Sequence, residues 1–341
     1  MYSGRYFFNA FNSIRNPIFD RISKITPHSD SDRSASRSNI VTTGIRMISR
    51  KLSPALGAEI RGIDFSEPLS SQARDDVIGL LSEHQLLVFP GQRLSCEQQI
   101  AACGAFGELE PHPMTTNTSS FPEMTIVSNV TSDGKPVGYP TPPFELWHSD
   151  LCYLEHPAKM TFFYAESVPD AHGDTWFANM FRAYETLPDE LKAAIDGKHA
   201  VFSLDSSLVK RCRKIGFDLN IAEDDFKPTV SHPAVRTHPH THQRSIFVNW
   251  AHTDRIEGYS PEESDEILDR IFAHCRNEDF IYRHRYANED LVIWDNASLI
   301  HTNSPNPPVG NRIMRRVMVS GPKPRGGRAN SDRRVSGMPG A

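Results

Sequence analysis

The chain has 341 residues, a formal net charge of −5 at pH 7 and five cysteines. This mildly acidic balance gives no electrostatic footprint for nucleic acid, although basic residues focused in a pocket could still hold a small anion. No apolar run approaches the roughly 18 residues that a membrane span requires. An odd number of cysteines without a CxxC spacing is typical of reduced thiols, so we expect a cytoplasmic protein without disulfides or a zinc ribbon.

The first 46 residues differ in composition from the rest of the chain. They include a serine-rich run and cannot bury enough apolar area to fold alone. Three interpretations stay open: a disordered extension, an organelle presequence that its aspartates argue against, or a start assigned too far upstream of Met47. We expect the folded domain to span residues 47–321, followed by a disordered basic tail over 322–341.

The elements expected before the candidate site are short and mixed. They are a strand at 56–64, a helix at 70–83, a buried strand at 86–89 and a helix from 95 to 107. Proline and glycine then dominate residues 111–143, which favours a long loop with one strand at 124–128. A long loop that leads into candidate ligands is more often an active-site lid than a linker.

The elements expected after the candidate site are again mainly strands. They are strands at 160–166, 174–177, 244–249, 280–286 and 312–320, a helical region at 179–195 broken at Pro188, and a helix at 261–274 that starts with a capping box. Residues 198–243 indicate no clear element. Many short strands without regular βαβ alternation predict a mainly β fold with flanking helices, built on a β-barrel or jelly-roll core.

Residues 147–150 hold the strongest candidate pair of metal ligands. In an extended strand residues i and i+2 face the same side, so His148 and Asp150 can point at one ion. His301, after the strand-like run 290–295, is the best third ligand. Two histidines and one carboxylate that leave three positions open suit non-haem Fe(II) and oxygen chemistry. A His-x-Asp pair alone is a weak signal, because such a histidine more often packs in a core.

Two arginines of the last strand support a binding pocket. Arg312, Met314 and Arg316 share one face of that strand by alternation. Arginine is suited to bidentate capture of a carboxylate, and His301 is near in sequence. The alternative is a pair of exposed arginines on an edge strand. Arg315, on the opposite face, is expected at the surface or in an ion pair.

A predicted turn that contains Pro239 also holds three alternating histidines, His238, His240 and His242. They could be taken for a metal site. We predict a solvated hairpin tip instead, because the run precedes a strand and contains Pro239.

Several stretches in this order resemble the Fe(II)/2-oxoglutarate-dependent dioxygenases of the taurine dioxygenase type. The resemblance covers residues 52–324. It rests on Phe106-Gly107-Glu108-Leu109-Glu110-Pro111-His112-Pro113, Trp147-His148-Ser149-Asp150, Gly173-Asp174-Thr175, the run from His238-Pro239 to Asn249, Trp294-Asp295-Asn296, His301, and Arg312 with Arg316.

The resemblance implies a double-stranded β-helix (a cupin-like jelly roll) and a set of ligand roles. His148, Asp150 and His301 match the iron ligands. Arg312, eleven residues after His301, matches the arginine that pairs with the distal carboxylate of 2-oxoglutarate, and Thr175 matches the hydroxyl that helps to hold it. Assembly as a homodimer or homotetramer is a further implication of the family.

The resemblance also implies a small anionic substrate. Arg316 matches a residue that faces the anionic group of the substrate, and His112 matches a second anion contact. Phe144 stands where a taurine-specific enzyme carries asparagine to meet the amine, so an alkyl sulfate, a sulfonate or a carboxylate is expected rather than taurine. Asp150 disfavours halogenation, because iron halogenases of this superfamily lack that carboxylate.

The implied reaction consumes O2 and 2-oxoglutarate, releases succinate and CO2, and hydroxylates the substrate. The product is a stable alcohol, or an aldehyde where the attacked carbon bears a sulfonate, sulfate or ether oxygen. Two alternatives stay open. One is the same oxidant used for desaturation or other tailoring in biosynthesis, and the other is a non-catalytic, metal-dependent protein that binds a small acid.

Overall fold

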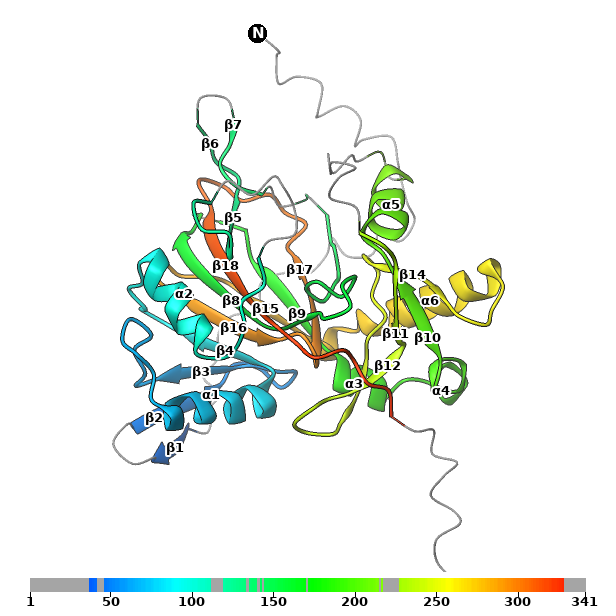
Figure 1. Ribbon diagram of the computed structural model, residues 1–341, viewed down its shortest axis with the longest axis horizontal. Helices are drawn as coiled ribbons and strands as arrows, with labels where there is room; N and C mark the ends of the chain where they lie inside the picture. Colours follow the sequence, from blue (N-terminus) through cyan, green and yellow to red (C-terminus); the bar gives the residue numbers. More distant parts are fainter. Residues whose placement is uncertain are drawn as a thin grey trace, which may run out of the picture. The chain divides into compact units, whose positions relative to one another are not determined.

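Strands dominate the computed structural model, which describes residues 37–41, 46–111, 119–132, 135–139, 142, 144–169, 171–214, 216 and 227–327 (Figure 1). The strands are β1 (Arg37–Val41), β2 (Arg46–Lys51), β3 (Ala58–Arg61), β4 (Leu86–Phe89), β5 (Met124–Ser128), β6 (Thr131–Ser132), β7 (Lys135–Pro136), β8 (Ala158–Ser167), β9 (Thr175–Asn179), β10 (His199–Phe202), β11 (Val230–Pro233), β12 (Val235–Thr237), β13 (Arg244–Ile246), β14 (Thr253–Ile256), β15 (Ile281–His284), β16 (Leu291–Asp295), β17 (Leu299–Asn303) and β18 (Ile313–Ser320).

The described helical segments begin within one residue of the predicted positions, except those at 204–209, 210–214 and 278–280, for which the sequence predicts no helix. They are α1 (Ser71–His84), α2 (Cys96–Gly104), α3 (Met180–Glu185), α4 (Asp189–Ile195), the π-helical η3 (Leu204–Val209), α5 (Lys210–Lys214), α6 (Pro261–Cys275) and the 3-10 turn η5 (Glu278–Phe280). Ser70, Ser95 and Ser260 cap α1, α2 and α6 by accepting a hydrogen bond from a backbone N–H of the first turn, which satisfies a donor that the helix itself cannot. No helix in these described ranges is both long and apolar enough to cross a membrane.

Two sheets face each other across the core that carries the site. In the described part of the chain, the main sheet has eight strands in the order β1-β2-β3-β4-β16-β8-β18-β5, and the smaller sheet has the order β15-β9-β17. Side chains of both sheets meet in one buried cluster that includes Phe163 of β8, Phe177 of β9, Trp294 of β16 and Leu299 of β17. This arrangement is the double-stranded β-helix that the sequence predicts.

Strand β4 illustrates how the main sheet is buried on both faces. All four of its residues are buried. Leu86 and Val88 join the cluster between the sheets, whereas Leu87 and Phe89 join a second cluster with residues of α1 and α2. Figure 1 shows these two helices beside the same sheet. A strand covered on both faces has no polar alternation, which explains why it is a continuous apolar run in the sequence.

The described residues of 198–280 form an additional lobe, whose buried side chains share a hydrophobic cluster with residues outside it such as Trp147, Ala178 and Ile300. The strands β11, β10 and β14 pair in that order, and buried residues of β10, η3 and α6 share one hydrophobic cluster. The sequence indicates no clear element for 198–243. Strands of three or four residues and a π-helical segment carry too little periodicity to be recognised.

The prediction of a solvated hairpin tip is wrong for one of its three histidines. β12 and β13 do form a hairpin, and His240 and His242 are exposed at its turn. His238 is buried, and its Nε2 lies 2.8 Å from Asp295 Oδ2. Burial alone would raise the pKa of Asp295, but its interactions with His238, Ser298 and the backbone N–H of Ala297 together outweigh burial and lower the pKa. Sequence alternation cannot reveal a partner on a distant strand.

Parts of the two predicted terminal extensions are described. Within the first 46 residues, β1 pairs with β2 along its whole length. In the C-terminal tail, residues up to Gly327 are described, and Arg325 O accepts a hydrogen bond of 2.8 Å from Thr237 N of β12. Residues 1–36 and 328–341 lie outside the described residues.

Candidate active site

A β-bridge sets the positions of two candidate ligands. His148 and His301 exchange both backbone hydrogen bonds, with N to O distances of 2.9 and 2.8 Å. Directly opposed residues of an antiparallel pair project their side chains to the same face, and the two imidazole centroids lie 4.2 Å apart. His301 also pairs with Phe177 of β9. The register of the smaller sheet therefore determines where His301 points.

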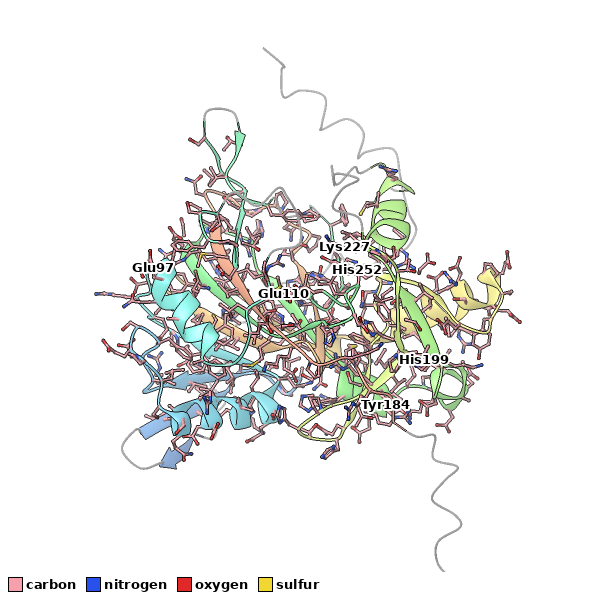
Figure 2. The ribbon with its side chains drawn as sticks, in the orientation of Figure 1. Glu97, Glu110, Tyr184, His199, Lys227 and His252 are labelled. Carbon is pink, nitrogen blue, oxygen red and sulfur yellow. The ribbon has the colours of Figure 1, made fainter. Side chains whose placement is uncertain are left out.

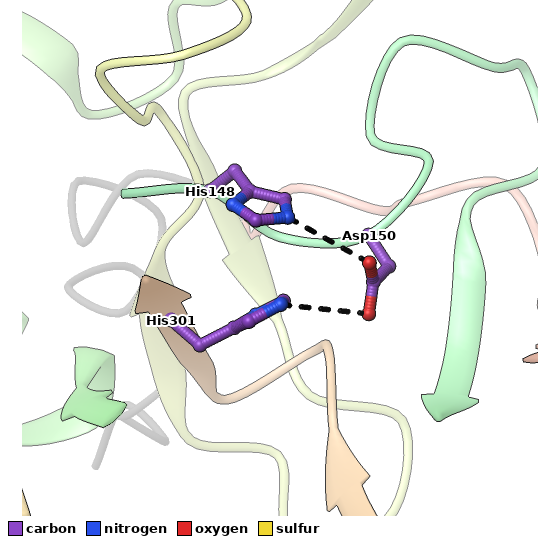
Figure 3. Close-up of side chains that lie close together, drawn as sticks. All are labelled: His148, Asp150 and His301. Carbon is purple, nitrogen blue, oxygen red and sulfur yellow. Dashed lines mark ion pairs between the residues drawn. The ribbon is translucent and has the colours of Figure 1, made fainter. Parts of the chain in front are cut away.

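Asp150 joins this pair from a turn. The bridge ends at His148, Leu151 adopts a φ of +55°, and Asp150 N donates to Asn296 Oδ1 rather than to a neighbouring strand. His148 Nε2 lies 3.7 Å from Asp150 Oδ1, and His301 Nε2 lies 3.9 Å from Asp150 Oδ2 (Figure 3). The structure thus brings the three predicted side chains together, although the chain turns at Asp150 where the sequence predicts an extended strand.

The protonation states of these groups suit a divalent metal. His148 Nδ1 donates to Leu146 O at 2.6 Å, which leaves Nε2 free of a proton. Burial lowers the pKa of His148, and it lowers the pKa of His301 to about 3. Burial alone would raise the pKa of Asp150, but nearby His301 and Arg316 outweigh it and lower the pKa to about 2. At neutral pH the group therefore offers two neutral imidazoles and one carboxylate, the donors that metal binding requires.

Two residues to which the sequence assigns no role hold the Asp150 carboxylate in place. Thr161 of β8 donates to Asp150 Oδ2 at 2.6 Å, and Asn296 Nδ2 donates to Thr161 Oγ1 at 2.9 Å. Asn296 Oδ1 accepts from the Asp150 backbone and from Trp294 Nε1. Such partners orient metal ligands. Asn296 lies in the Trp294-Asp295-Asn296 stretch, whereas no sequence signal points to Thr161.

A first cavity joins the candidate ligands to Arg312. Thr175 and Arg312 line it together with His148 and His301. Arg312 Nε donates to Gly173 O at 3.0 Å. Gly173 has a φ of +79°, and a Cβ at that position would lie 3.0 Å from Arg312 Cδ, so a side chain there would displace the guanidinium. The Gly173-Asp174-Thr175 stretch therefore shapes this end of the cavity.

Unsatisfied donors in the first cavity fit an anionic ligand. Arg312 is buried, and among the described residues its Nη1 has no hydrogen-bond partner. Burial lowers the pKa of Arg312. Thr175 Oγ1 accepts from Tyr286 O–H at 2.9 Å, so its own proton is free to be donated. A buried guanidinium without a counter-ion is costly, and a carboxylate between Arg312 and Thr175 would remove that cost.

A second cavity lies on the other side of the candidate ligands. It shares Tyr139, Leu146, His148 and Arg316 with the first, and Asp150, Leu151, Tyr153, Leu204, Leu208 and His252 complete its described lining. Arg316 Nη1 lies 3.3 Å from Asp150 Oδ1. Figure 2 marks His252, which directly precedes β14. Leu204, Leu208 and His252 belong to the additional lobe, and no motif in the sequence marks them.

The predicted faces of the last strand are largely correct. Arg312 and Arg316 line the same cavity, and Met314 lies in the cluster between the sheets. Arg315 faces the other way and is ion-paired with Glu166 at 3.3 Å. It is buried rather than at the surface, because its stem packs where α2 covers the sheet, and its Nη2 donates to Leu94 O.

Two predicted substrate residues remain, His112 and Phe144. His112 lies outside the described residues. Phe144 is partly buried and packs against the hydrophobic cluster of the additional lobe. It is not among the described residues that line either cavity.

The fold and this constellation define a class of protein, the non-haem iron dioxygenases that use 2-oxoglutarate. The family model "Taurine catabolism dioxygenase TauD, TfdA family" matches residues 49–318. The chain belongs to this family. It is therefore an oxidoreductase that uses Fe(II), 2-oxoglutarate and O2.

Relatives and solved structures agree with this assignment. The chain is 32% identical over 267 residues to the alpha-ketoglutarate-dependent 2,4-dichlorophenoxyacetate dioxygenase of Cupriavidus pinatubonensis, covering 75% of this chain and 91% of the relative. It is 26% identical over 273 residues to pentalenolactone F synthase of Streptomyces arenae, covering 77% and 91%. The crystal structure of AAD-2 in complex with Mn(II) and N-oxalylglycine aligns with a TM-score of 0.68 at 29% identity, covering 82% of this chain and 98% of that one.

Proposed function

We propose that His148, Asp150 and His301 hold the iron, and that Arg312 and Thr175 hold the distal carboxylate of 2-oxoglutarate. The observation that carries this proposal is the buried Nη1 of Arg312, which has no partner among the described residues and belongs to the cavity that the two histidines line. The bound iron and 2-oxoglutarate supply the oxidising chemistry and yield succinate and CO2.

The residues of this chain orient the substrate and exclude competing reactions. Arg316, at the junction of the two cavities, holds the anionic group of the substrate, and His112 provides a second contact. Holding one end of the substrate presents one C–H bond to the iron and removes much of the entropic barrier. Thr161 and Asn296 fix the Asp150 carboxylate, so that the metal keeps one orientation relative to the substrate cavity.

The proposed reaction is hydroxylation of a small organic anion. A carboxylate is favoured over taurine, because one relative is named for 2,4-dichlorophenoxyacetate. Sulfonates and alkyl sulfates remain within the proposed class. The attacked carbon decides whether the product is a stable alcohol or collapses to an aldehyde.

A second candidate function is oxidative tailoring in a biosynthetic pathway. A relative named pentalenolactone F synthase favours it. We also propose a cytoplasmic location, which the five free thiols support, and a homodimer or homotetramer, which rests on the family resemblance alone. Light scattering of the purified protein tests the oligomeric state.

Succinate release tests the proposal. The protein is loaded with Fe(II) without oxygen and then given O2 and 2-oxoglutarate with sulfonates, alkyl sulfates and carboxylates. We expect substrate-stimulated succinate that the His301→Ala variant does not produce. Tight binding of 2-oxoglutarate without turnover of any anion would favour the non-catalytic binding protein instead.

A further inference from the structure

Among the described residues that line the second cavity, η3 contributes two leucines and no polar side chain. Leu204 and Leu208 lie four residues apart in this π-helical segment, both are nearly fully buried, and both line the cavity that contains His148 and Asp150. We propose that this η3 wall, Leu204 with Leu208, determines the substrate class: an organic monoanion whose remaining body is uncharged and apolar. The inference rests on the proposed function, since it assumes that Arg316 holds the anion.

The η3 wall has a fixed position. Ser203, directly before η3, donates its N–H to His252 O at 2.9 Å, and its carbonyl accepts from Ser207 Oγ at 2.6 Å. His252 Nδ1 also donates to Ser203 O at 3.3 Å. These bonds tie the start of η3 to the loop that carries His252, another residue of the cavity. A π-helical segment is rare and is often found at functional sites.

The charges of the second cavity select against a substrate ammonium group. Among the described residues that line it, the only carboxylate is Asp150 and the only guanidinium is Arg316. Asp150 is committed to the metal in the proposed function, so no carboxylate of the described lining is left to pair with a cation. Burying an unpaired ammonium group is strongly unfavourable. Zwitterions such as taurine are therefore disfavoured by the charges of this cavity.

The remaining lining favours an apolar body. Leu146 and Leu151 lie in the same cavity as the η3 wall, and Tyr139 and Tyr153 add aromatic rings. Four leucines and two aromatic rings around one anion-binding arginine match a ligand with one charged end and an apolar remainder, the usual composition of a small-molecule site. The size of residues 204 and 208 then limits how large that remainder can be.

Isosteric pairs of probes test the charge requirement. Binding to protein loaded with Mn(II) and N-oxalylglycine is measured by calorimetry for pentanoate against 4-aminobutanoate, and for 1-propanesulfonate against taurine. Each pair differs by a methyl group in place of an ammonium group. We expect the monoanion of each pair, which lacks the ammonium group, to bind at least about a hundredfold more tightly than the zwitterion. Equal affinities within both pairs would overturn the proposal.

Variants of the η3 wall test the size requirement. Leu208→Ala should raise kcat/KM for phenoxyacetate relative to pentanoate by roughly tenfold, and Leu208→Phe should lower the same ratio, because a few methylene groups of a pocket change discrimination by this amount. Leu268→Ala is the matched control, since Leu268 is equally buried in the same cluster but does not line the cavity. If the ratio of kcat/KM for phenoxyacetate to that for pentanoate changes no more in the Leu208 variants than in Leu268→Ala, the proposed role of η3 in substrate size is overturned.

Failure of the inference differs from failure of the proposed function. If anions bind to the loaded protein and stimulate succinate, while neither the isosteric pairs nor the Leu208 variants discriminate, only the inference fails. If no anion binds and none stimulates succinate release, the proposed function fails, and the inference fails too because it depends on that function. Binding of 2-oxoglutarate should be unchanged in all three variants.

Discussion

The two cavities beside the candidate iron ligands are built from different parts of the chain. The first, which contains Arg312 and Thr175, is formed by strands of the two facing sheets and is fixed by hydrogen bonds such as that from Arg312 to Gly173. The second receives a wall from η3 of the additional lobe. In the proposed function, the difference separates two tasks: the sheets hold the groups that every turnover requires, and the lobe shapes the space for the substrate.

The largest expected effect tests the three candidate iron ligands, which line the two cavities between them. His301→Ala should weaken metal binding and lower succinate release on the order of a thousandfold or more, because a site with three protein ligands loses one of them. The backbone bridge between residues 148 and 301 should remain, since it does not depend on the side chain. Titration with Co(II) and succinate assays measure the two losses. His232→Ala, another buried histidine, should leave metal affinity unchanged. A comparable loss in that control would mean that the effect is general unfolding.

The next effect should be confined to the first cavity. Arg312→Met should raise KM for 2-oxoglutarate roughly a hundredfold, since truncating one partner of a buried charge pair costs about 2–5 kcal/mol. Steady-state kinetics at saturating substrate measure it. Arg315→Met removes an equally buried arginine from the opposite face of β18. Arg315→Met should lower the stability of the protein with little change in KM for 2-oxoglutarate. If the Arg312 and Arg315 variants raised this KM equally, Arg312 would have no special role in binding 2-oxoglutarate.

A smaller effect is expected when the hydrogen bond from Thr161 to the Asp150 carboxylate is removed. Thr161→Val keeps the shape of the side chain but removes the hydrogen bond of 2.6 Å to Asp150 Oδ2. Metal affinity should fall about tenfold, the lower end for residues that orient a ligand, and Thr161→Ser should restore it. Mn(II) binding followed by electron paramagnetic resonance provides the readout. Unchanged affinity in the valine variant would show that Asp150 needs no such support.

The smallest effect concerns pH. Burial lowers the pKa of His252 from an ordinary 6.5 to about 3, and that of His301 likewise. The unfolded chain therefore binds protons more readily than the folded one, so stability falls as the pH drops from 6.5 toward 3. Metal-free protein should lose about 1 kcal/mol of unfolding free energy between pH 7 and pH 6, measured by urea denaturation. His252→Asn should reduce this slope, and an unchanged slope would assign the effect to other groups.

The division between the facing sheets and the additional lobe also explains which features the sequence can predict. His148, Asp150, His301 and the two pocket arginines lie in short stretches with fixed chemical requirements, and the structure brings them together. Helix starts at Ser70, Ser95 and Ser260 are equally local, because a cap depends on residues within one turn. Such features need no knowledge of distant contacts.

Other features depend on partners that are far apart in the sequence. Thr161 receives its role from Asn296, and His238 is buried because Asp295 lies beside it. Leu204 and Leu208 matter only because the additional lobe places η3 against the site. Hydrophobic periodicity cannot identify these residues, since a leucine that lines a cavity has the same local pattern as one in a core.

The β-bridge between His148 and His301 links metal affinity to strand register. A slip of β17 by one residue would place Ile300 or Thr302 opposite His148 and turn the His301 imidazole to the other face of the sheet. A chain misassembled in this way would lack one ligand, even if most of its core were intact. Stoichiometric metal uptake therefore counts the molecules whose smaller sheet is paired correctly, and it can serve as an assay of folding quality for those variants above that keep the three ligands and Thr161.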